Sequence, residues 1–242
     1  MEKVMEINGI INGIVWGPWM LALLVGTGVY LTVILGLPQL RYFFLMFKEV
    51  FGNLGSKKDG EGAISSFAAL STALASTVGT GNIAGVATAL HLGGPGALFW
   101  MLVSAFFGMT TKMAEVILAV RFREKDDLGN WRGGTMYILE KGANAKWLAW
   151  LFALFGFLAS FGIGCAVQSN SVAEGFEMGF GIPYLWSGVV VAILTALVII
   201  GGLKRISDVT TYLVPFMAIF YIVGAGIVVF THSEMIPTAF AN

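Results

Sequence analysis

Charged residues are scarce in this sequence. Asp, Glu, Lys and Arg make up 12% of the 242 residues, whereas hydrophobic residues make up 57%. A soluble domain usually has about 25% charged residues, and a disordered chain has few apolar ones, so this composition excludes both classes. The 14 basic and 14 acidic residues also balance, which leaves no basic excess of the kind that nucleic-acid-binding proteins carry. The composition is typical of an all-α polytopic membrane protein.

Cysteine and reactive clusters are also sparse. Because Cys165 is the only cysteine, the chain can form neither an internal disulfide nor a cysteine-based metal site. The apolar stretches contain no nucleophile–base set and no metal-ligand cluster, so we do not expect an enzyme. The first six residues are not positively charged, and the apolar stretch after them is longer than that of a signal peptide. We therefore expect a retained first membrane span.

Long uncharged runs, by contrast, are abundant. A membrane-spanning helix needs about 20 mostly apolar residues. The uncharged run 7–40 predicts one span, and the uncharged run 62–111 is divided in two by the turn-forming residues 93–96. The sequence predicts six spans in all, near residues 14–37, 64–92, 97–120, 147–173, 178–203 and 209–233.

The basic residues predict how these spans are oriented. The loops after the first, third and fifth spans hold four, six and two of the 14 basic residues, at positions 41–58, 121–146 and 204–205. Because cytoplasmic loops of membrane proteins are enriched in Lys and Arg, we expect these three loops in the cytoplasm. Both termini of the chain and the segment 174–184 are then external.

The second predicted span contains a run of small and polar residues. Residues 75–85 combine four polar side chains with three glycines, of which Gly79 and Gly81 lie near the middle of the span. Each glycine in a helix costs about 1 kcal/mol relative to alanine, and lipid cannot satisfy free backbone groups, so a break here must line an enclosed cavity. Free N–H groups at such a break suit a carboxylate, and free C=O groups suit Na⁺.

Two other interpretations of this run compete with a binding site. Gly81 and Gly85 are four residues apart, as in close helix contacts, so the glycines can serve packing alone. The spacing of Gly79, Gly81 and Gly85 also resembles a dinucleotide-binding fingerprint. That motif requires a preceding strand and an acidic residue about 20 residues later, whereas the next acid here is Glu115.

The third and fourth predicted spans carry further polar side chains, which are costly in a membrane unless they have a partner. We predict that Gln168 and Asn170 border a substrate, with hydrogen bonding between helices as the alternative. They are two positions apart, so a regular helix directs them to different sides and one contact should be indirect. Phe176 is predicted to cap a small pocket, with plain packing as its alternative. Lys112 and Glu115 share a helix face and predict an ion pair, with a gating or proton-transfer role as the alternative.

Several of these segments resemble the alanine/glycine:cation symporter family. The resemblance covers essentially the whole chain and is carried by residues 60–67, 75–89, 92–97, 108–115, 133–137, 161–164 and 167–173. It implies a leucine-transporter-like fold, in which one five-helix repeat (about 64–233) follows an extra N-terminal helix (about 14–37). On this view residues 1–242 form a single transmembrane domain, and the second five-helix repeat of the fold is absent from the chain.

The resemblance also implies roles for the residues of the second span. Residues 78–82 are similar to the broken first helix of the neurotransmitter:sodium symporters. If the likeness holds, the amides of Thr80 and Gly81 receive a substrate carboxylate. The carbonyl groups of Ala75 and Val78 then face one Na⁺, and the carbonyl of Thr77 with the side-chain oxygen of Asn82 faces a second, because hard oxygen ligands suit a hard cation.

The function implied by the resemblance is symport of small neutral amino acids such as alanine and glycine across the cell membrane by alternating access. Na⁺ is the expected coupling ion, with H⁺ as the alternative, and no organic cofactor is expected. The chain would be a partial half that needs the second repeat or a complementary chain. A channel-like or non-transporting membrane protein is the alternative, although the sequence has neither charged rings nor a selectivity-filter motif.

Overall fold

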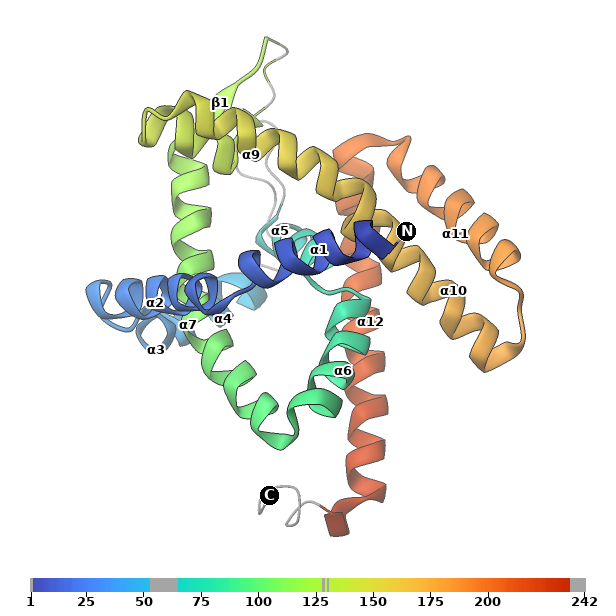
Figure 1. Ribbon diagram of the computed structural model, residues 1–242. Coiled ribbons are helices and arrows are strands. Elements are labelled where there is room, and N and C mark those ends of the chain that lie inside the picture. The colour runs from blue at the N-terminus through green and yellow to red at the C-terminus, as the bar shows by residue number, and fades with distance from the viewer. Residues whose placement is uncertain (1, 53–64, 128, 130, 236–242) are drawn as a thin grey trace. The chain divides into compact units, whose positions relative to one another are not determined.

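The computed structural model describes residues 2–52, 65–127, 129 and 131–235, and these residues are mostly helical (Figure 1). The α-helices are α1 (Glu2–Val15), α2 (Pro18–Ile34), α3 (Pro38–Arg41), α4 (Phe43–Gly52), α5 (Ser66–Thr77), α6 (Ala84–Gly93), α7 (Pro95–Arg121), α8 (Thr135–Tyr137), α9 (Lys146–Ala159), α10 (Val167–Phe180), α11 (Tyr184–Ile199) and α12 (Gly202–Thr231). Two 3₁₀ turns, η1 (Thr80–Asn82) and η4 (Ser233–Met235), and two π-helical segments, η2 (Ile138–Gly142) and η3 (Ser160–Ala166), complete the helical structure. The strands β1 (Glu124–Lys125) and β2 (Trp131–Arg132) form a short antiparallel pair that the sequence did not predict.

The helices agree in part with the six predicted spans. Among the described residues, four helical segments are long and apolar enough to cross a membrane: Met5–Ile34, Pro95–Arg121, Lys146–Phe180 and Lys204–Thr231. A fifth arises if the bent pair of α5 and α6 counts as one span. The helix in the predicted span 178–203 is α11, which is apolar but has only 16 residues. This is a polytopic helical membrane protein, and its sixth span stays a prediction.

Two of the predicted features extend beyond the described residues. Lys57 and Lys58, which we expect in a cytoplasmic loop, lie outside them. So does residue 64, where the second predicted span begins, together with residues 60–63 of a segment that carries the family resemblance. The first predicted span, near 14–37, corresponds to α2 and includes only the last two residues of α1, which ends at Val15.

The pattern of burial is the reverse of that in a soluble protein. Most large apolar side chains are exposed on the surface of the described chain, for example Trp19, Phe44 and Phe230, whereas many of the buried residues are small or polar. The buried polar residues are Thr32, Gln39, Ser71, Thr110, Ser187 and Ser207. Small and hydroxyl-bearing residues let membrane helices approach closely, while apolar side chains face lipid. The burial pattern therefore agrees with a membrane protein.

The described chain divides into two compact units. The first unit comprises the described residues of Met1–Leu45 and Leu98–Phe152. In it α2 packs against α7, and the hydroxyl groups of Thr32 and Thr110 lie 2.9 Å apart across this contact. Gln39 of α3 donates from Nε2 to Thr32 Oγ1 (2.9 Å) and to the Phe106 carbonyl (3.1 Å). These polar contacts hold α2 and α3 to α7.

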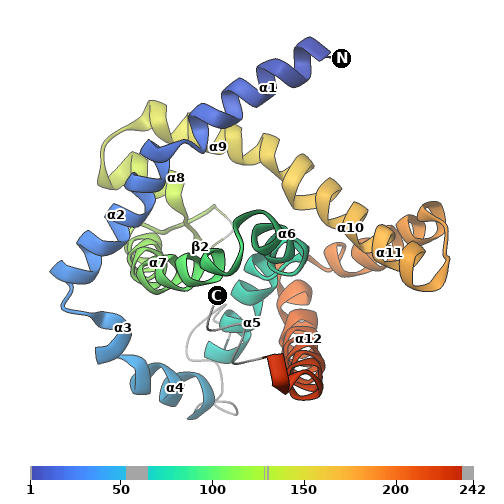
Figure 2. The ribbon, with the colours of Figure 1, turned by 60° about the horizontal axis from the view of Figure 1, so that its bottom comes forward.

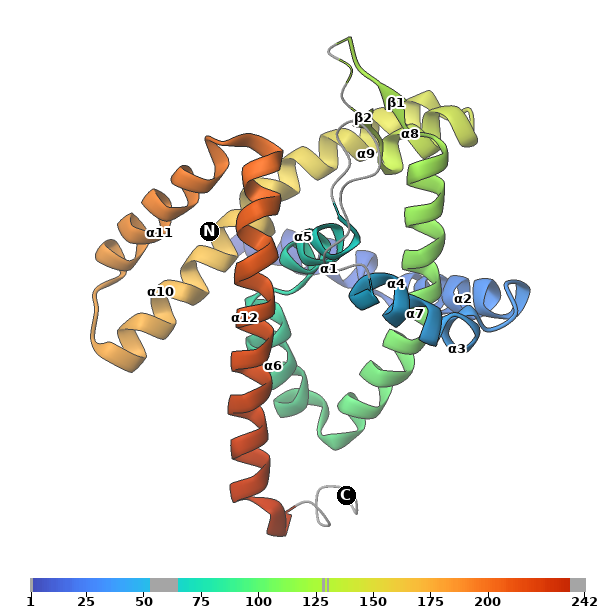
Figure 3. The same ribbon diagram turned by 180° about the vertical axis from the view of Figure 1, so that it is seen from behind.

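The second unit comprises the described residues of Met46–Ala97 and Ala153–Asn242 and contains the broken second span. In it α5 lies beside α12, where Thr72 Oγ1 is 3.4 Å from Ser207 Oγ and 3.3 Å from Thr210 Oγ1 (Figure 2). The helices α10 and α11 form a hairpin, which Figure 3 shows from behind together with the long α12. The hairpin turns at Gly181, whose φ of 68° is left-handed and therefore suits glycine. This unit positions the candidate site.

Candidate functional site

The second predicted span is broken where its glycines predicted a break. The helix α5 begins at the N-cap Ser65, whose Oγ accepts a hydrogen bond from the Ala68 N–H (3.2 Å), and it ends at Thr77. Val78 and Gly79 are then extended. The helical chain resumes with η1 and α6, and this segment, Thr80–Gly93, lies at an angle of 74° to α5. The φ of −141° at Gly79 is open to any residue, so the reason for glycine here is space rather than backbone strain.

The break leaves backbone groups free on both sides. Among the residues that the structure describes, the N–H groups of Gly79 and Gly81 donate no hydrogen bond, and the carbonyl groups of Ala75 and Val78 accept none. The N–H of Thr80 donates to a side chain, Oε1 of Gln168, at 3.0 Å. Unpaired donors and acceptors are therefore concentrated in residues 75–81, as the anion- and cation-binding interpretation requires.

A largely apolar cavity of about 420 Å³ adjoins the break within the second unit. It is lined by Leu74, Val78, Gly79, Thr80, Asn82 and Ile83 of the broken span, Gln168 of α10, and Val214, Met217, Ala218, Tyr221 and Ile222 of α12. Its few polar groups come chiefly from the broken span and Gln168. A mostly apolar cavity with a small number of polar groups is the usual form of a small-molecule site.

The sequence did not predict the contribution of α12 to the cavity. The lining residues of α12, from Val214 to Ile222, include pairs that are three or four positions apart, which is the spacing of one helix face. That periodicity was visible in the sequence. It did not stand out because the predicted sixth span is apolar on every side, so no stripe could be distinguished from the lipid-facing surface.

The structure brings some predicted site residues to the cavity and not others. Val78, Thr80, Asn82 and Gln168 line it. The remaining predicted residues, Ala75, Thr77, Gly81, Asn170 and Phe176, do not. Phe176 is 43% exposed and its ring packs against that of Phe180, with centroids 5.9 Å apart. Gln168 thus lines the cavity directly and Asn170, two positions along α10, does not.

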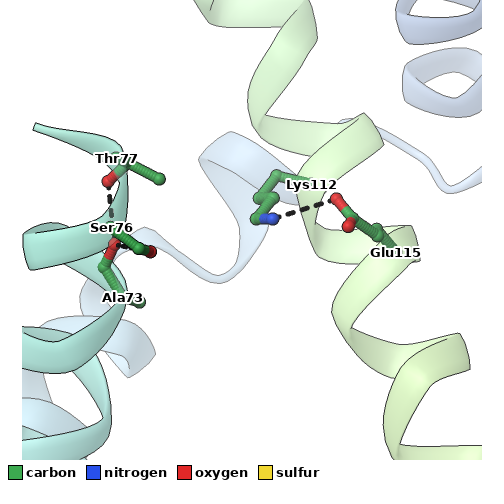
Figure 4. A network of polar contacts seen from close by, with 5 residues as sticks. All are labelled: Ala73, Ser76, Thr77, Lys112 and Glu115. Atoms are coloured by element: carbon green, nitrogen blue, oxygen red, sulfur yellow. Dashed lines mark hydrogen bonds and ion pairs between the residues drawn. The ribbon is translucent and has the colours of Figure 1, made fainter. Parts of the chain in front are cut away.

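The side chain of Asn82 lies near the end of α5. Its Nδ2 is 3.5 Å from the carbonyl oxygen of Thr77, at the limit of a hydrogen bond. The two predicted ligands are therefore neighbours. Asn82 would have to turn its amide so that Oδ1, rather than Nδ2, meets a cation held by the Thr77 carbonyl. The hydroxyl groups of Ser76 and Thr77 donate to the carbonyl of Ala73 within α5 (2.8 and 2.9 Å; Figure 4).

The predicted ion pair on α7 is present. Lys112 Nζ lies 3.0 Å from Glu115 Oε2, and both side chains are about half exposed (Figure 4). An exposed pair three residues apart on one helix is worth only a few tenths of a kcal/mol. The structure therefore supports the local ion pair, and among the described residues the pair makes no contact that favours a gating or proton-transfer role.

Comparison with known proteins identifies the family. Residues 1–242 match the model of the sodium:alanine symporter family. The chain is 53% identical over 233 residues to the sodium/alanine symporter AgcS of Methanococcus maripaludis, covering 95% of this chain and 51% of that protein. The chain therefore belongs to the sodium:alanine symporter family, a family of transporters rather than enzymes.

Two relatives from Bacillus subtilis carry other names. The chain is 40% identical over 227 residues to the putative sodium/proton-dependent alanine carrier protein YrbD, covering 94% of this chain and 46% of that protein. It is 38% identical over 245 residues to the probable sodium/glutamine symporter GlnT, covering 100% of this chain and 50% of that protein. The chain spans about half the length of the relatives that it matches.

Proposed function

We propose that these residues form part of a cation-coupled symporter for small neutral amino acids, with alanine and glycine as substrates and Na⁺ as the coupling ion. The observation that carries the proposal is the broken span, in which free amides and free carbonyls meet beside a cavity of about 420 Å³. An amino acid is a zwitterion, so its carboxylate suits the N–H groups and a nearby cation offsets its charge.

We assign the substrate to Thr80, Gly81 and Gln168. The predicted substrate contacts of Asn170 and Phe176, which do not line the cavity, stay predictions. The cation is assigned to the carbonyl groups of Ala75, Thr77 and Val78 and to the Asn82 side chain. The α12 face, with Met217 and Tyr221, forms the apolar wall opposite the break. Such a wall suits a short apolar side chain and disfavours a charged one, because a charge buried without a partner is costly.

The proposed architecture is a leucine-transporter-like fold that works by alternating access, with one five-helix repeat in residues 64–233 after the extra N-terminal helix. The other half of the site would come from a second repeat or a complementary chain, which agrees with relatives about twice as long. We further propose a cell-membrane location, with the basic loops in the cytoplasm and both termini of the chain outside.

Uptake by full-length protein in proteoliposomes tests the proposal. Radiolabelled alanine should accumulate when Na⁺ is higher outside than inside, and an equal choline gradient should not drive it. Glycine should compete, whereas glutamate should not. Accumulation that follows a pH gradient and ignores Na⁺ would replace Na⁺ by H⁺. Alanine flux that never exceeds equilibration under any ion gradient would contradict symport and favour the channel-like alternative.

A further inference from the structure

Gln168 and Thr80 both line the cavity and are hydrogen-bonded to each other. Oε1 of Gln168 accepts two hydrogen bonds from the same residue, from the Thr80 N–H (3.0 Å) and from the Thr80 hydroxyl (2.8 Å). A backbone N–H can only donate, so the amide atom facing it must be the oxygen and not the nitrogen. The two bonds together fix which way the amide of Gln168 is turned.

The consequence is that Nε2 of Gln168 is the end of the amide left for another partner. Gln168 lines the cavity, and within the described part of the chain Nε2 has no hydrogen-bond acceptor. An amide nitrogen offers two N–H donors and accepts none. Nε2 of Gln168 is therefore a neutral hydrogen-bond donor at the cavity that can bind an acceptor, such as a carboxylate.

Gly79 provides the space for this arrangement. A Cβ at position 79 would lie 3.0 Å from Oε1, 3.1 Å from Nε2 and 3.3 Å from Cδ of Gln168. The amide of Gln168 thus lies directly against the backbone of Gly79. A Cβ there would require the amide, and with it the donor Nε2, to shift by a few tenths of an ångström.

The π-helical segment η3 ends immediately before Val167, the first residue of α10. A π turn holds more residues than an α turn, so it rotates the side chains that follow it about the helix axis. Gln168 is the second residue after η3, and its direction therefore depends on that turn. Such segments often accompany functional sites.

We propose that Thr80 is a positioning residue, which turns the amide of Gln168 so that Nε2 donates to the carboxylate of the transported amino acid. This inference rests on the proposed function. It assigns the carboxylate contact to a side chain that Thr80 orients, because the Thr80 N–H is already used by Gln168. The substrate class it selects is an amino acid with a free carboxylate.

Two other roles for Gln168 make different predictions. It can serve only to satisfy the backbone of the broken span, or it can compete with the substrate for the Thr80 N–H. The change Gln168→Glu separates these roles, because a carboxylate still accepts from Thr80 and replaces the donor Nε2 by a second acceptor oxygen. Gln168→Leu removes both functions.

The measurement is the ratio of the dissociation constants for alanine and alaninamide, which lacks a carboxylate, in the full-length protein with saturating Na⁺. If Nε2 binds the carboxylate, Gln168→Glu should weaken alanine binding by about 30-fold or more, as expected for the loss of a hydrogen bond to a charged group. Alaninamide binding should change far less, because its own N–H₂ can donate to the new oxygen. Detergent-solubilised variants should elute as wild type does and keep its melting temperature.

Thr80 and Gly79 provide the test of positioning. Thr80→Val removes one of the two bonds to Oε1 and should reduce the preference for alanine over alaninamide by about 2- to 10-fold, the range for one neutral hydrogen bond. Thr80→Ser should restore the preference. Gly79→Ala should reduce it as well. The matched control is Gly85→Ala, where a Cβ would meet nothing within 4 Å and the preference should not change.

Each remaining outcome overturns the inference. An unchanged preference in Gln168→Glu means that Gln168 only satisfies the backbone. Tighter alanine binding in Gln168→Leu means that the side chain competes with the substrate. In both cases Na⁺-driven uptake by wild-type protein would still stand, so the proposed function survives. If wild-type protein neither binds nor accumulates alanine, both the proposed function and this inference are wrong.

Discussion

Gly28 of α2 lies directly against Phe107 of α7, so that a Cβ at position 28 would be 2.9 Å from the carbonyl oxygen of Phe107. The contact is with the backbone of Phe107, and backbone atoms in a helix cannot move aside as the tip of a flexible side chain can. Together with the hydrogen bond between the hydroxyl groups of Thr32 and Thr110, this contact holds α2 against α7.

Gly28→Leu should therefore destabilise the protein. Overpacking of this kind costs about 1–3 kcal/mol, so the apparent melting temperature in detergent should fall by several degrees. Gly26→Leu is the matched control, because a Cβ at position 26 meets nothing within 4 Å and the same helix receives the same residue. Equal melting temperatures for the two variants would show that α2 does not pack on α7 through Gly28.

The uncharged runs of the sequence predicted most of the helices, because lipid requires long apolar segments whatever their neighbours are. The break near Gly79 and Gly81 was predictable for a similar local reason, since glycine and polar residues are costly in a helix in lipid. Gln168 was identified because an amide in a membrane span needs a partner. Each of these signals belongs to a single segment.

The features that escaped prediction depend on contacts between segments or on subtle helix geometry. The α12 face from Val214 to Ile222 is chemically like the lipid-facing sides of that helix, so only packing distinguishes it. The amino-acid composition of residues 160–166 does not distinguish a π-helical turn from an α-helix. The Thr80–Gln168 contact joins residues 88 positions apart, so no local sequence pattern could predict it.

The orientation of the chain can be tested by labelling single cysteines in intact cells. In a Cys165→Ser background, Gly179→Cys should react with an impermeant maleimide because we expect the 174–184 segment outside. Asp127→Cys, in the basic 121–146 loop, should react only after the cells are opened. Both positions are exposed in the structure, so access to each depends on the membrane rather than on burial. Labelling of Asp127→Cys in intact cells, with none of Gly179→Cys, would reverse the proposed topology.

Gly81→Leu should abolish alanine binding and leave membrane insertion intact. A Cβ at position 81 meets no described atom within 4 Å, so a leucine side chain can extend into the open space beside the break, where the carboxylate is proposed to bind. Leucine is favourable in a membrane helix by about 0.3–0.6 kcal/mol, so insertion should not suffer. Gly85→Leu, equally unobstructed, should keep binding. If both variants misfold, the two glycines serve helix packing, as the alternative interpretation of their spacing holds.

Asn82→Ala should weaken the dependence of alanine binding on Na⁺ rather than the binding site as a whole. The change removes an oxygen that is proposed to join the Thr77 carbonyl around the cation, and Asn82 already lies beside that carbonyl. We expect the Na⁺ concentration for half-maximal alanine binding to rise about tenfold, since one interaction with a charged group is worth about 1.5 kcal/mol or more. At saturating Na⁺ the affinity for alanine should approach that of wild type. Thr88→Ala is the control, because its hydroxyl only donates to the Ala84 carbonyl within α6. An unchanged Na⁺ dependence in Asn82→Ala, in protein that binds alanine normally, would remove Asn82 from the cation site.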